Sequence, residues 1–304
     1  MTRAIHVLHA PSPLGLKPQL EGRASGVRRA PQALRDAGLH NALGARFAGE
    51  VAPPPYVEER EAATSLRNVA SIAAYSVALA DATERLLDEG GLVLVLGGDC
   101  SILLGTALAL RRRGRFGVVY IDAHPDYLTT AQTETGGVAG LPLALVTGLG
   151  PDVLANLEGR RPYIDEHDAM VVGSRDPFQV RASPDGGKRV EESSIRVLDL
   201  DEVRDRGAAA LAGYVLERMQ ARGVDGVWVH LDVDVLDSAI MPAVDSPEPG
   251  GMSRDELVEL LRELVVSPLV RGLQVTIYDP DRDSDGSAAR LLVDLLSDAL
   301  NRDP

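Results

Sequence analysis

The amino-acid sequence predicts an α/β fold, a three-layer α/β/α sandwich around a mainly parallel sheet. Short apolar runs rich in Val, Ile and Leu alternate with longer stretches in which apolar residues recur every three or four positions. This alternation is typical of a parallel sheet with helices on both faces. Three of the runs end in dense polar sequence, and ligands collect outside the carboxyl ends of the strands in open parallel sheets.

The expected strands are the short apolar runs, and two of the expected helices have clear ends. Gly90 and Gly91 close the helical pattern that begins at Val69, and Ser253 with Glu256 forms a capping box for the helix that follows. The stretch 177–187 is expected to be a surface loop. The strand runs are AIHVLHA, LVLVLG, FGVVYID, AMVVGS, SIRVLDL, GVWVHLDV and RGLQVTI, in chain order.

The composition indicates a soluble protein with a large core. A chain of 304 residues with 45% hydrophobic residues is most simply one domain over 1–304. The formal net charge of −14 disfavours nucleic acid as a partner. No apolar run approaches the length of a membrane span, and the N-terminus lacks the apolar segment of a signal peptide. With Cys100 as the single cysteine, we expect a reducing, cytoplasmic setting.

Ionisable side chains follow three of the expected strands at their carboxyl ends. Residues two apart on a strand face the same way, so each cluster offers ligands that point in one direction. Carboxylates that face one another repel strongly, and bound divalent cations relieve that repulsion. The set is large enough for two divalent ions that share carboxylate bridges. Its members are Cys100, then Asp122, His124 and Asp126, then Asp232 and Asp234.

Each of these residues also has a simpler interpretation. A single Asp at the end of a strand is more often a turn residue or a helix cap, and a lone cysteine is more often a small core residue. Six candidates in three clusters favour a metal site instead. His230, two positions before Asp232, could lie behind the ligands, but a satisfied structural histidine is the favoured interpretation.

Three motifs carry a resemblance to a known family. GGDCS at 97–101, DAHPD at 122–126 and HLDVDVLDSAIMPA at 230–243 resemble the metal signatures of the arginase, agmatinase and formiminoglutamase family, the ureohydrolases. The resemblance implies an arginase-like fold, two Mn²⁺ ions and a metal-bridging hydroxide that attacks a guanidino or amidino carbon. It implies that Asp122, His124, Asp126, Asp232 and Asp234 are metal ligands, with His124 and Asp126 also catalytic and Asp126 orienting the hydroxide. Cys100, at the position of a sixth family ligand, is the remaining candidate. A homotrimer or homohexamer is the assembly it suggests.

The sequence departs from the family pattern at three positions. Cys100 replaces a histidine, and its thiolate would also admit softer ions such as zinc or iron. Ala139 replaces a histidine that serves in proton transfer or substrate contact, which leaves the proton donor open between His230, His167 and the acidic cluster 279–285. Ile277 replaces a glutamate that pairs with the guanidinium, so a less basic head group is expected.

The sequence therefore predicts a binuclear metal-dependent hydrolase of a linear, non-peptide C–N bond. The expected substrate is of guanidino or amidino type, such as N-omega-hydroxyarginine, and the product is urea or an analogue. Thr133 and Thr135 are candidate donors to a substrate carboxylate, although threonines in a loop are usually turn residues. Because Ala139 and Ile277 remove two family side chains, a catalytically weak metal-binding regulatory protein is an alternative. A hydrolase of amides or acylated amines is another.

Overall fold

The protein is built around one sheet of eight parallel strands. The computed structural model describes residues 3–18, 24–176 and 190–301, so the expected loop at 177–187 lies outside the described residues. The strand order is β2-β1-β3-β8-β7-β4-β5-β6, and every pair of neighbours is parallel. The strands are β1 (Ile5–Ala10), β2 (Arg46–Glu50), β3 (Leu92–Gly97), β4 (Phe116–Ile121), β5 (Ala169–Ser174), β6 (Arg196–Asp199), β7 (Gly226–Asp232) and β8 (Val270–Thr276).

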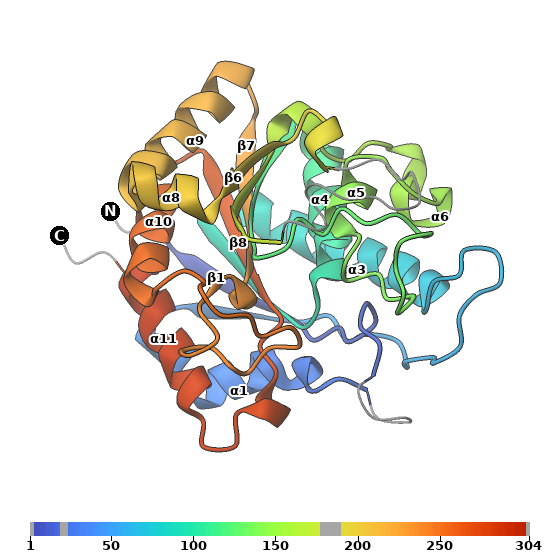
Figure 1. Ribbon diagram of the computed structural model, residues 1–304, viewed down its shortest axis with the longest axis horizontal. Helices are drawn as coiled ribbons and strands as arrows, with labels where there is room; N and C mark the ends of the chain where they lie inside the picture. The colour runs from blue at the N-terminus through green and yellow to red at the C-terminus, as the bar shows by residue number, and fades with distance from the viewer. Residues whose placement is uncertain (1–2, 19–23, 177–189, 302–304) are drawn as a thin grey trace.

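Helices cover both faces of this sheet, as Figure 1 shows, which confirms the predicted α/β/α layers. One layer contains α1 (Ala30–Asp36), α2 (Leu39–Ala42), α8 (Leu200–Arg206), α9 (Ala208–Arg222), α10 (Arg254–Val266) and α11 (Ser287–Leu300). The other contains α3 (Val69–Glu89), α4 (Leu103–Arg113), α5 (Pro142–Val146) and α6 (Asp152–Ala155). Among the described residues, no helix has the length and apolar character needed to cross a membrane.

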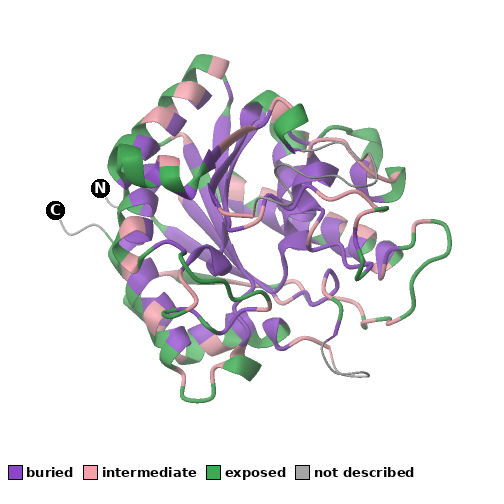
Figure 2. Cartoon of the chain, in the orientation of Figure 1, coloured by how far each residue is buried: buried purple, intermediate pink, exposed green. Residues whose placement is uncertain are grey.

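The local signals in the sequence explain where these elements begin and end. Gly90, at φ +78°, ends α3, and the side chain of Ser253 and the backbone of Glu256 form the capping box of α10, as predicted. The strands β3, β4, β5 and β7 are buried along their whole length because helices lie on both faces, and they form part of the purple core of Figure 2. The seven apolar runs are all strands, whereas β2 was missed because this edge strand is mostly exposed and carries no apolar run.

The topology brings distant parts of the chain together at one edge of the sheet. The chain leaves β3 and continues to β4, and the gap between these two strands is later filled by β7 and β8. Because all strands are parallel, the carboxyl ends of β3, β8, β7 and β4 lie side by side. The three polar motifs follow β3, β4 and β7, so the fold gathers them at the centre of this edge.

Candidate metal centre

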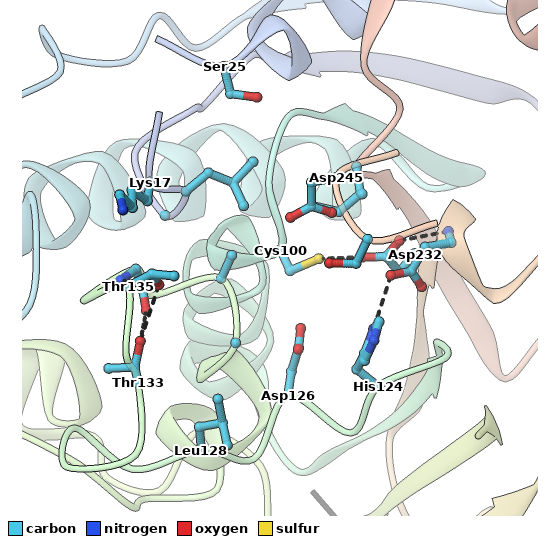
Figure 3. A pocket seen from close by; sticks show the side chains of 18 of the residues that line it. Lys17, Ser25, Cys100, His124, Asp126, Leu128, Thr133, Thr135, Asp232 and Asp245 are labelled. Carbon is cyan, nitrogen blue, oxygen red and sulfur yellow. Dashed lines mark hydrogen bonds and ion pairs between the residues drawn. The ribbon is translucent and has the colours of Figure 1, made fainter. Parts of the chain in front are cut away.

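A cavity of about 460 Å³ opens above the carboxyl ends of the central strands. Its floor is acidic, and Figure 3 shows the labelled carboxylates turned toward one another. Thr133 and Thr135 line the same cavity on the side away from this floor. Asp122 is 1% exposed and is not among the described residues that line the cavity, but its carboxylate lies in the same cluster as Cys100, Asp232 and Asp234. The floor consists of Cys100, His124, Asp126, Asp232 and Asp234. The structure thus brings all eight candidate residues to one place.

The end of β7 positions two carboxylates through a short 3-10 turn, η6 (Val233–Val235). Asp232 caps this turn, because its Oδ1 accepts a hydrogen bond of 2.9 Å from the backbone N–H of Asp234. The Arg175 guanidinium donates to the Asp234 carbonyl over 2.8 Å and to the Val235 carbonyl over 3.1 Å. This clamp on backbone oxygens fixes the turn and leaves both carboxylates directed at the neighbouring strand end.

The loop after β4 supplies three more candidates. Oδ1 of Asp122 accepts a hydrogen bond of 2.6 Å from the backbone N–H of His124. Nδ1 of His124 lies 3.0 Å from Oδ2 of Asp234, so the loop is joined to the end of β7. Asp126 has φ +48°, in the left-handed region that Asp tolerates better than most residues. The Tyr120 hydroxyl donates to Oδ2 of Asp126 over 2.5 Å and holds this carboxylate in the cavity wall.

The loop after β3 buries Cys100 beside these carboxylates. Asp99 caps the 3-10 turn η2 (Cys100–Ile102) by accepting a hydrogen bond of 2.9 Å from the backbone N–H of Ser101. The Cys100 thiol donates to Oδ2 of Asp232 over 2.8 Å and lies 3.3 Å from Oγ1 of Thr276. Burial and the nearby carboxylates of Asp232 and Asp126 raise the pKa of the Cys100 thiol well above its usual value.

The carboxylates have strongly perturbed acidities. Burial, followed by the charge of Asp234, raises the pKa of Asp122 to about 8. Burial and neighbouring carboxylates also raise the pKa values of Asp126 and Asp232 well above normal. Burial acts on Asp234 in the same direction, but the hydrogen bond and charge of His124 outweigh it and lower the pKa of Asp234. Hydrogen bonds to Asp122 and Asp234 raise the pKa of His124 against the effect of its burial.

These features fit a site for divalent cations. Asp122 Oδ2 is buried and has no hydrogen-bond partner, although its carboxylate faces the cluster. Two groups of ligand atoms each lie within 4.8 Å of one another, and they share Asp122. Cations would stabilise carboxylates that burial otherwise keeps protonated, and would replace the proton that His124 holds between two acids. The first group consists of Cys100, Asp122, His230 and Asp232. The second group consists of Asp122, His124 and Asp234.

The threonines and the two departures from the family pattern also lie around the cavity. The Thr133 hydroxyl donates to the Gly137 carbonyl over 3.3 Å, and Oγ1 of Thr135 accepts from the Gly137 N–H over 3.0 Å. Ala139 and Ile277 line the cavity and are 9% and 3% exposed. Ile277 has φ +73°, a strained conformation for a β-branched residue. The cavity wall is therefore apolar where the family has a glutamate.

Sequence reasoning missed two charged residues of this cavity that matter for its chemistry, Asp245 and Lys17, and a third, Glu134, which is exposed between the two threonines. Asp245 lines it, and burial together with the charge of Asp234 raises the pKa of Asp245 to about 6. Lys17 lies on its outer rim and is exposed. Both are on loops outside the three motifs, and only their place in the folded chain reveals them. His167 is bonded to Asp165 and is not among the described residues that line the cavity.

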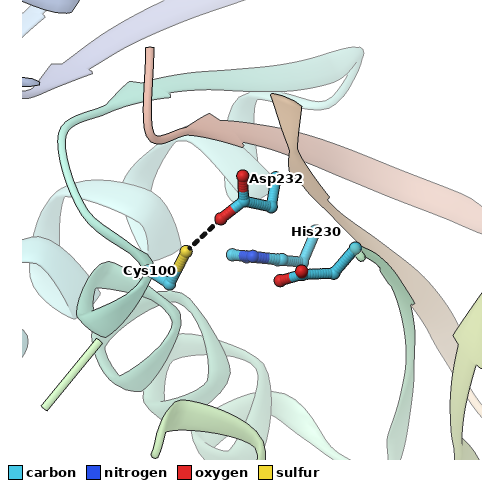
Figure 4. A group of neighbouring side chains, drawn as sticks. Cys100, His230 and Asp232 are labelled. Atoms are coloured by element: carbon cyan, nitrogen blue, oxygen red, sulfur yellow. Dashed lines mark hydrogen bonds between the residues drawn. The ribbon is translucent and has the colours of Figure 1, made fainter. Parts of the chain in front are cut away.

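His230 is buried, but the prediction of a fully satisfied structural histidine is wrong. Its Nδ1 lies 2.7 Å from Nε2 of Gln274, and its ring stacks on Tyr120 with a centroid separation of 4.1 Å. Its Nε2 is buried without a hydrogen-bond partner. Figure 4 shows the ring edge pointing toward Cys100 and Asp232. Since His230 is fully buried and is not among the described residues that line the cavity, it cannot deliver a proton to a substrate there.

Comparison with known proteins places this geometry in a family. The family model described as "Arginase family" matches residues 15–301. The chain belongs to the arginase family. An arginase of Brucella melitensis biotype 1 is 31% identical over 306 residues, with 95% of each chain covered. An arginase of Bacillus subtilis (strain 168) is 29% identical over 299 residues, covering 96% of this chain and 97% of the relative.

Solved structures agree with membership of the arginase family. The arginase from Bacillus caldovelox superposes with a TM-score of 0.85 at 25% identity, over 99% of both chains. The proclavaminate amidino hydrolase of Streptomyces clavuligerus superposes with a TM-score of 0.70 at 23% identity, over 98% of this chain and 91% of that one, which shows the shared fold. The predicted family, the arginase-like α/β fold and the enzyme class, a metal-dependent hydrolase of non-peptide C–N bonds, are thereby confirmed.

Proposed function

We propose that this arginase-family chain is a binuclear metallohydrolase of a guanidino-type amino acid such as N-omega-hydroxyarginine, releasing urea or an analogue. The observation that carries the proposal is the convergence of six candidate ligand side chains at the base of one cavity, five of them on its floor and Asp122 buried beside them. They are Cys100, Asp122, His124, Asp126, Asp232 and Asp234. Two Mn²⁺ ions are the first choice, and the Cys100 sulfur also suits zinc or iron. When bound, two such ions would lower the pKa of a coordinated water so that it could act as hydroxide near neutral pH.

The protein's own residues position the reactants. Asp126, held by Tyr120 at the cavity wall, would accept a hydrogen bond from the attacking water and orient it. His124 would be kept as a ligand by its neighbours Asp122 and Asp234. Since a histidine ligand must be neutral, its proton is lost when the site fills.

The two ends of the cavity suit the two ends of an amino acid. Lys17, Thr133 and Thr135 lie away from the acidic floor and offer a cation and hydroxyl groups to a carboxylate. Asp245 lies beside the floor, where it would accept hydrogen bonds from the head group of the substrate. A substrate without a carboxylate, such as agmatine, would leave the first set of contacts unused.

The head group is proposed to be less basic than a simple guanidinium. Ile277 gives the cavity an apolar wall, and a strongly basic cation is costly to desolvate without a carboxylate at that position. With a pKa of about 6, Asp245 is mainly ionised near neutral pH, which suits a group that first takes up a proton and then returns it to the departing nitrogen. This assignment fills the role that Ala139 cannot perform.

Several features of the setting belong to the same proposal. We infer one domain over 1–304, in keeping with the single sheet of the described residues. The free, buried thiol of Cys100 favours a reducing cytoplasmic compartment. The partner is expected to be a small molecule, and the chain is expected to assemble as a homotrimer or homohexamer.

The test combines metal content with the release of urea or hydroxyurea. Purified protein should contain two divalent ions per chain and release hydroxyurea from N-hydroxy-L-arginine faster than it releases urea from L-arginine or agmatine. Asp126→Asn should abolish turnover, whereas Asp255→Asn, which changes an exposed carboxylate on α10, should not. One ion or none, with no turnover of any of the three compounds, would overturn the proposal in favour of a regulatory metal-binding protein. Equal or better turnover of L-arginine would refute the proposed head group.

A further inference from the structure

The orientation of the His230 imidazole follows from the hydrogen bonds of Gln274. The indole N–H of Trp228 donates to Oε1 of Gln274 over 2.9 Å, and an indole nitrogen cannot accept. The hydroxyl of Thr106 lies 2.6 Å from the same oxygen. These contacts fix which end of the amide is oxygen, so the Gln274 nitrogen faces His230.

The orientation of the Gln274 amide determines the tautomer of His230. Nε2 of Gln274 has only protons to offer, so Nδ1 of His230, 2.7 Å away, must accept. A ring nitrogen that accepts carries no proton, and the neutral imidazole then holds its proton on Nε2. A histidine bound to a metal through Nε2 needs the opposite arrangement, with a proton on Nδ1. His230 therefore faces the metal centre as a donor.

The Nε2–H has no hydrogen-bond partner among the described residues, but the ring edge points toward one group of potential acceptors. A ring nitrogen of His230, Sγ of Cys100 and one oxygen each of Asp122 and Asp232 lie within 4.8 Å of one another. Oδ1 of Asp232 already accepts from the backbone N–H of Asp234. A carboxylate that bridges two cations uses its oxygens on the metals, whereas a thiolate bound to one cation keeps lone pairs for a donor.

We propose that His230 is a positioning residue that donates its Nε2–H to the Cys100 thiolate when that sulfur binds a metal ion. In this structure Cys100 is a thiol whose S–H faces Asp232; as a thiolate it has no proton to donate and becomes an acceptor. Four carboxylates and a thiolate carry one more negative charge than two divalent cations neutralise. A hydrogen bond to sulfur reduces that excess and makes the thiolate a weaker donor to the metal.

This inference rests on the proposed metal centre but does not depend on its substrate. It also explains the buried network around His230, since stacking on Tyr120 and the contact to Gln274 hold the ring with its Nε2 edge toward Cys100. Cys100 would then bind the ion, and the hydrogen bond from His230 would weaken electron donation from the Cys100 sulfur to that ion.

The first test reads the tautomer by nuclear magnetic resonance. Proton–nitrogen correlation spectra of the zinc-loaded protein should show one imidazole, lost in His230→Phe, that is protonated at Nε2 and bare at Nδ1. Gln274→Glu offers Nδ1 an acceptor in place of a donor and should move the proton to Nδ1. Thr106→Val removes a contact on the oxygen side of Gln274 and a hydrogen bond to the Leu103 carbonyl, and it should leave the tautomer unchanged. A wild-type ring protonated at Nδ1 would overturn the inference.

The second test measures how strongly the Cys100 sulfur donates electrons to a bound metal ion. Cobalt-loaded protein should show a thiolate-to-cobalt charge-transfer band that Cys100→Ser removes. His230→Phe keeps the stacked ring but lacks the N–H, so the band should move to longer wavelength because the sulfur electrons are held less tightly. An unmoved band, no band in the wild type, or the loss of an imidazole from the metal shell of His230→Phe would each refute the proposal. Because neither readout needs turnover, a failure of the proposed substrate would be seen separately, in the urea assay.

Discussion

The hydroxyl of Tyr120, at the end of β4, donates a hydrogen bond of 2.5 Å to Oδ2 of Asp126, six positions further along the chain. The bond restrains a carboxylate that stands on a strained loop with a backbone φ of +48°. Its loss should therefore disturb the orientation of the attacking water more than it disturbs the fold.

Tyr120→Phe tests this relationship. Hydrogen bonds to charged groups contribute about 1.5–3 kcal/mol, so kcat/KM should fall by roughly ten- to a hundredfold. Metal content should stay the same, because the ring that stacks on His230 is retained. Tyr163→Phe, which removes a hydroxyl bonded to the Leu154 carbonyl, serves as the control. Unchanged kinetics in Tyr120→Phe would show that the hydrogen bond does not position Asp126 for catalysis.

Metal removal should make stability depend on pH. The folded chain keeps a proton on Asp122 up to a pKa of about 8, whereas the unfolded chain releases it near the ordinary value of 3.8. Between these values the folded state binds more protons, so stability falls as pH rises. Chelator-treated protein should lose melting temperature from about pH 4 to about pH 8. Metal-loaded protein should lose much less, and identical curves would contradict a metal site at these carboxylates.

Arg175→Lys should weaken the metal site without touching a ligand. The guanidinium donates to carbonyls on both sides of a loop, and the single ammonium of Lys cannot span them. Loss of such supporting contacts typically lowers metal affinity about 10–100-fold, which titration calorimetry would detect. Arg204→Lys changes a similar contact to the Gly251 carbonyl on the surface and is the control. Equal affinities in the two variants would argue against the clamp. The carbonyls that accept hydrogen bonds from Arg175 belong to Asp234, Val235, Leu236 and Glu248.

Ile277→Glu should change substrate preference. A carboxylate in the apolar wall could pair with a guanidinium, and a charge-assisted contact of about 1.5–3 kcal/mol corresponds to roughly a ten- to hundredfold change. The ratio of kcat/KM for L-arginine to that for N-hydroxy-L-arginine should rise by this factor. Ile277→Gln has the same shape without the charge and should leave the ratio near the wild-type value. A ratio that rises equally in both variants would assign the effect to shape.

Asp245→Asn should alter the acid side of the pH profile. With a pKa of about 6, Asp245 loses its negative charge as the pH falls, and bound cations would place the transition at or below this value. In the wild type, kcat/KM should therefore decline toward low pH. The variant should have lower activity throughout and should lack this decline. A decline of unchanged position in Asp245→Asn would assign the transition to another group.

The parts of this protein that sequence could predict are those with a local signal. Continuous apolar runs such as Leu92–Gly97 must be strands buried on both faces, and polar residues directly after them must lie at one edge. The strand β2 at the exposed edge lacks such a run. The insertion of β8 between β3 and β7 is a tertiary relationship that no local pattern contains.

The residues of the candidate site likewise include some that the sequence could predict and some that it could not. The metal-binding side chains are in three compact motifs, so their meeting could be predicted from the sequence. Asp245 and Lys17 come from loops whose course depends on the whole fold. Two linked contacts, from Trp228 to Gln274 on β8 and from Gln274 to His230, determine which ring nitrogen of His230 carries the proton. Only the packed structure can specify such contacts.

The central place of β8 has a consequence for biosynthesis. Until this last strand has been made, β2, β1 and β3 form one ribbon and β7, β4, β5 and β6 another, with no strand to join them. Cys100 belongs to the first ribbon, and Asp122 and Asp232 belong to the second. A chain emerging from the ribosome therefore cannot gather these ligands until β8 has been made, so the protein should not acquire its ions before that strand has left the ribosome.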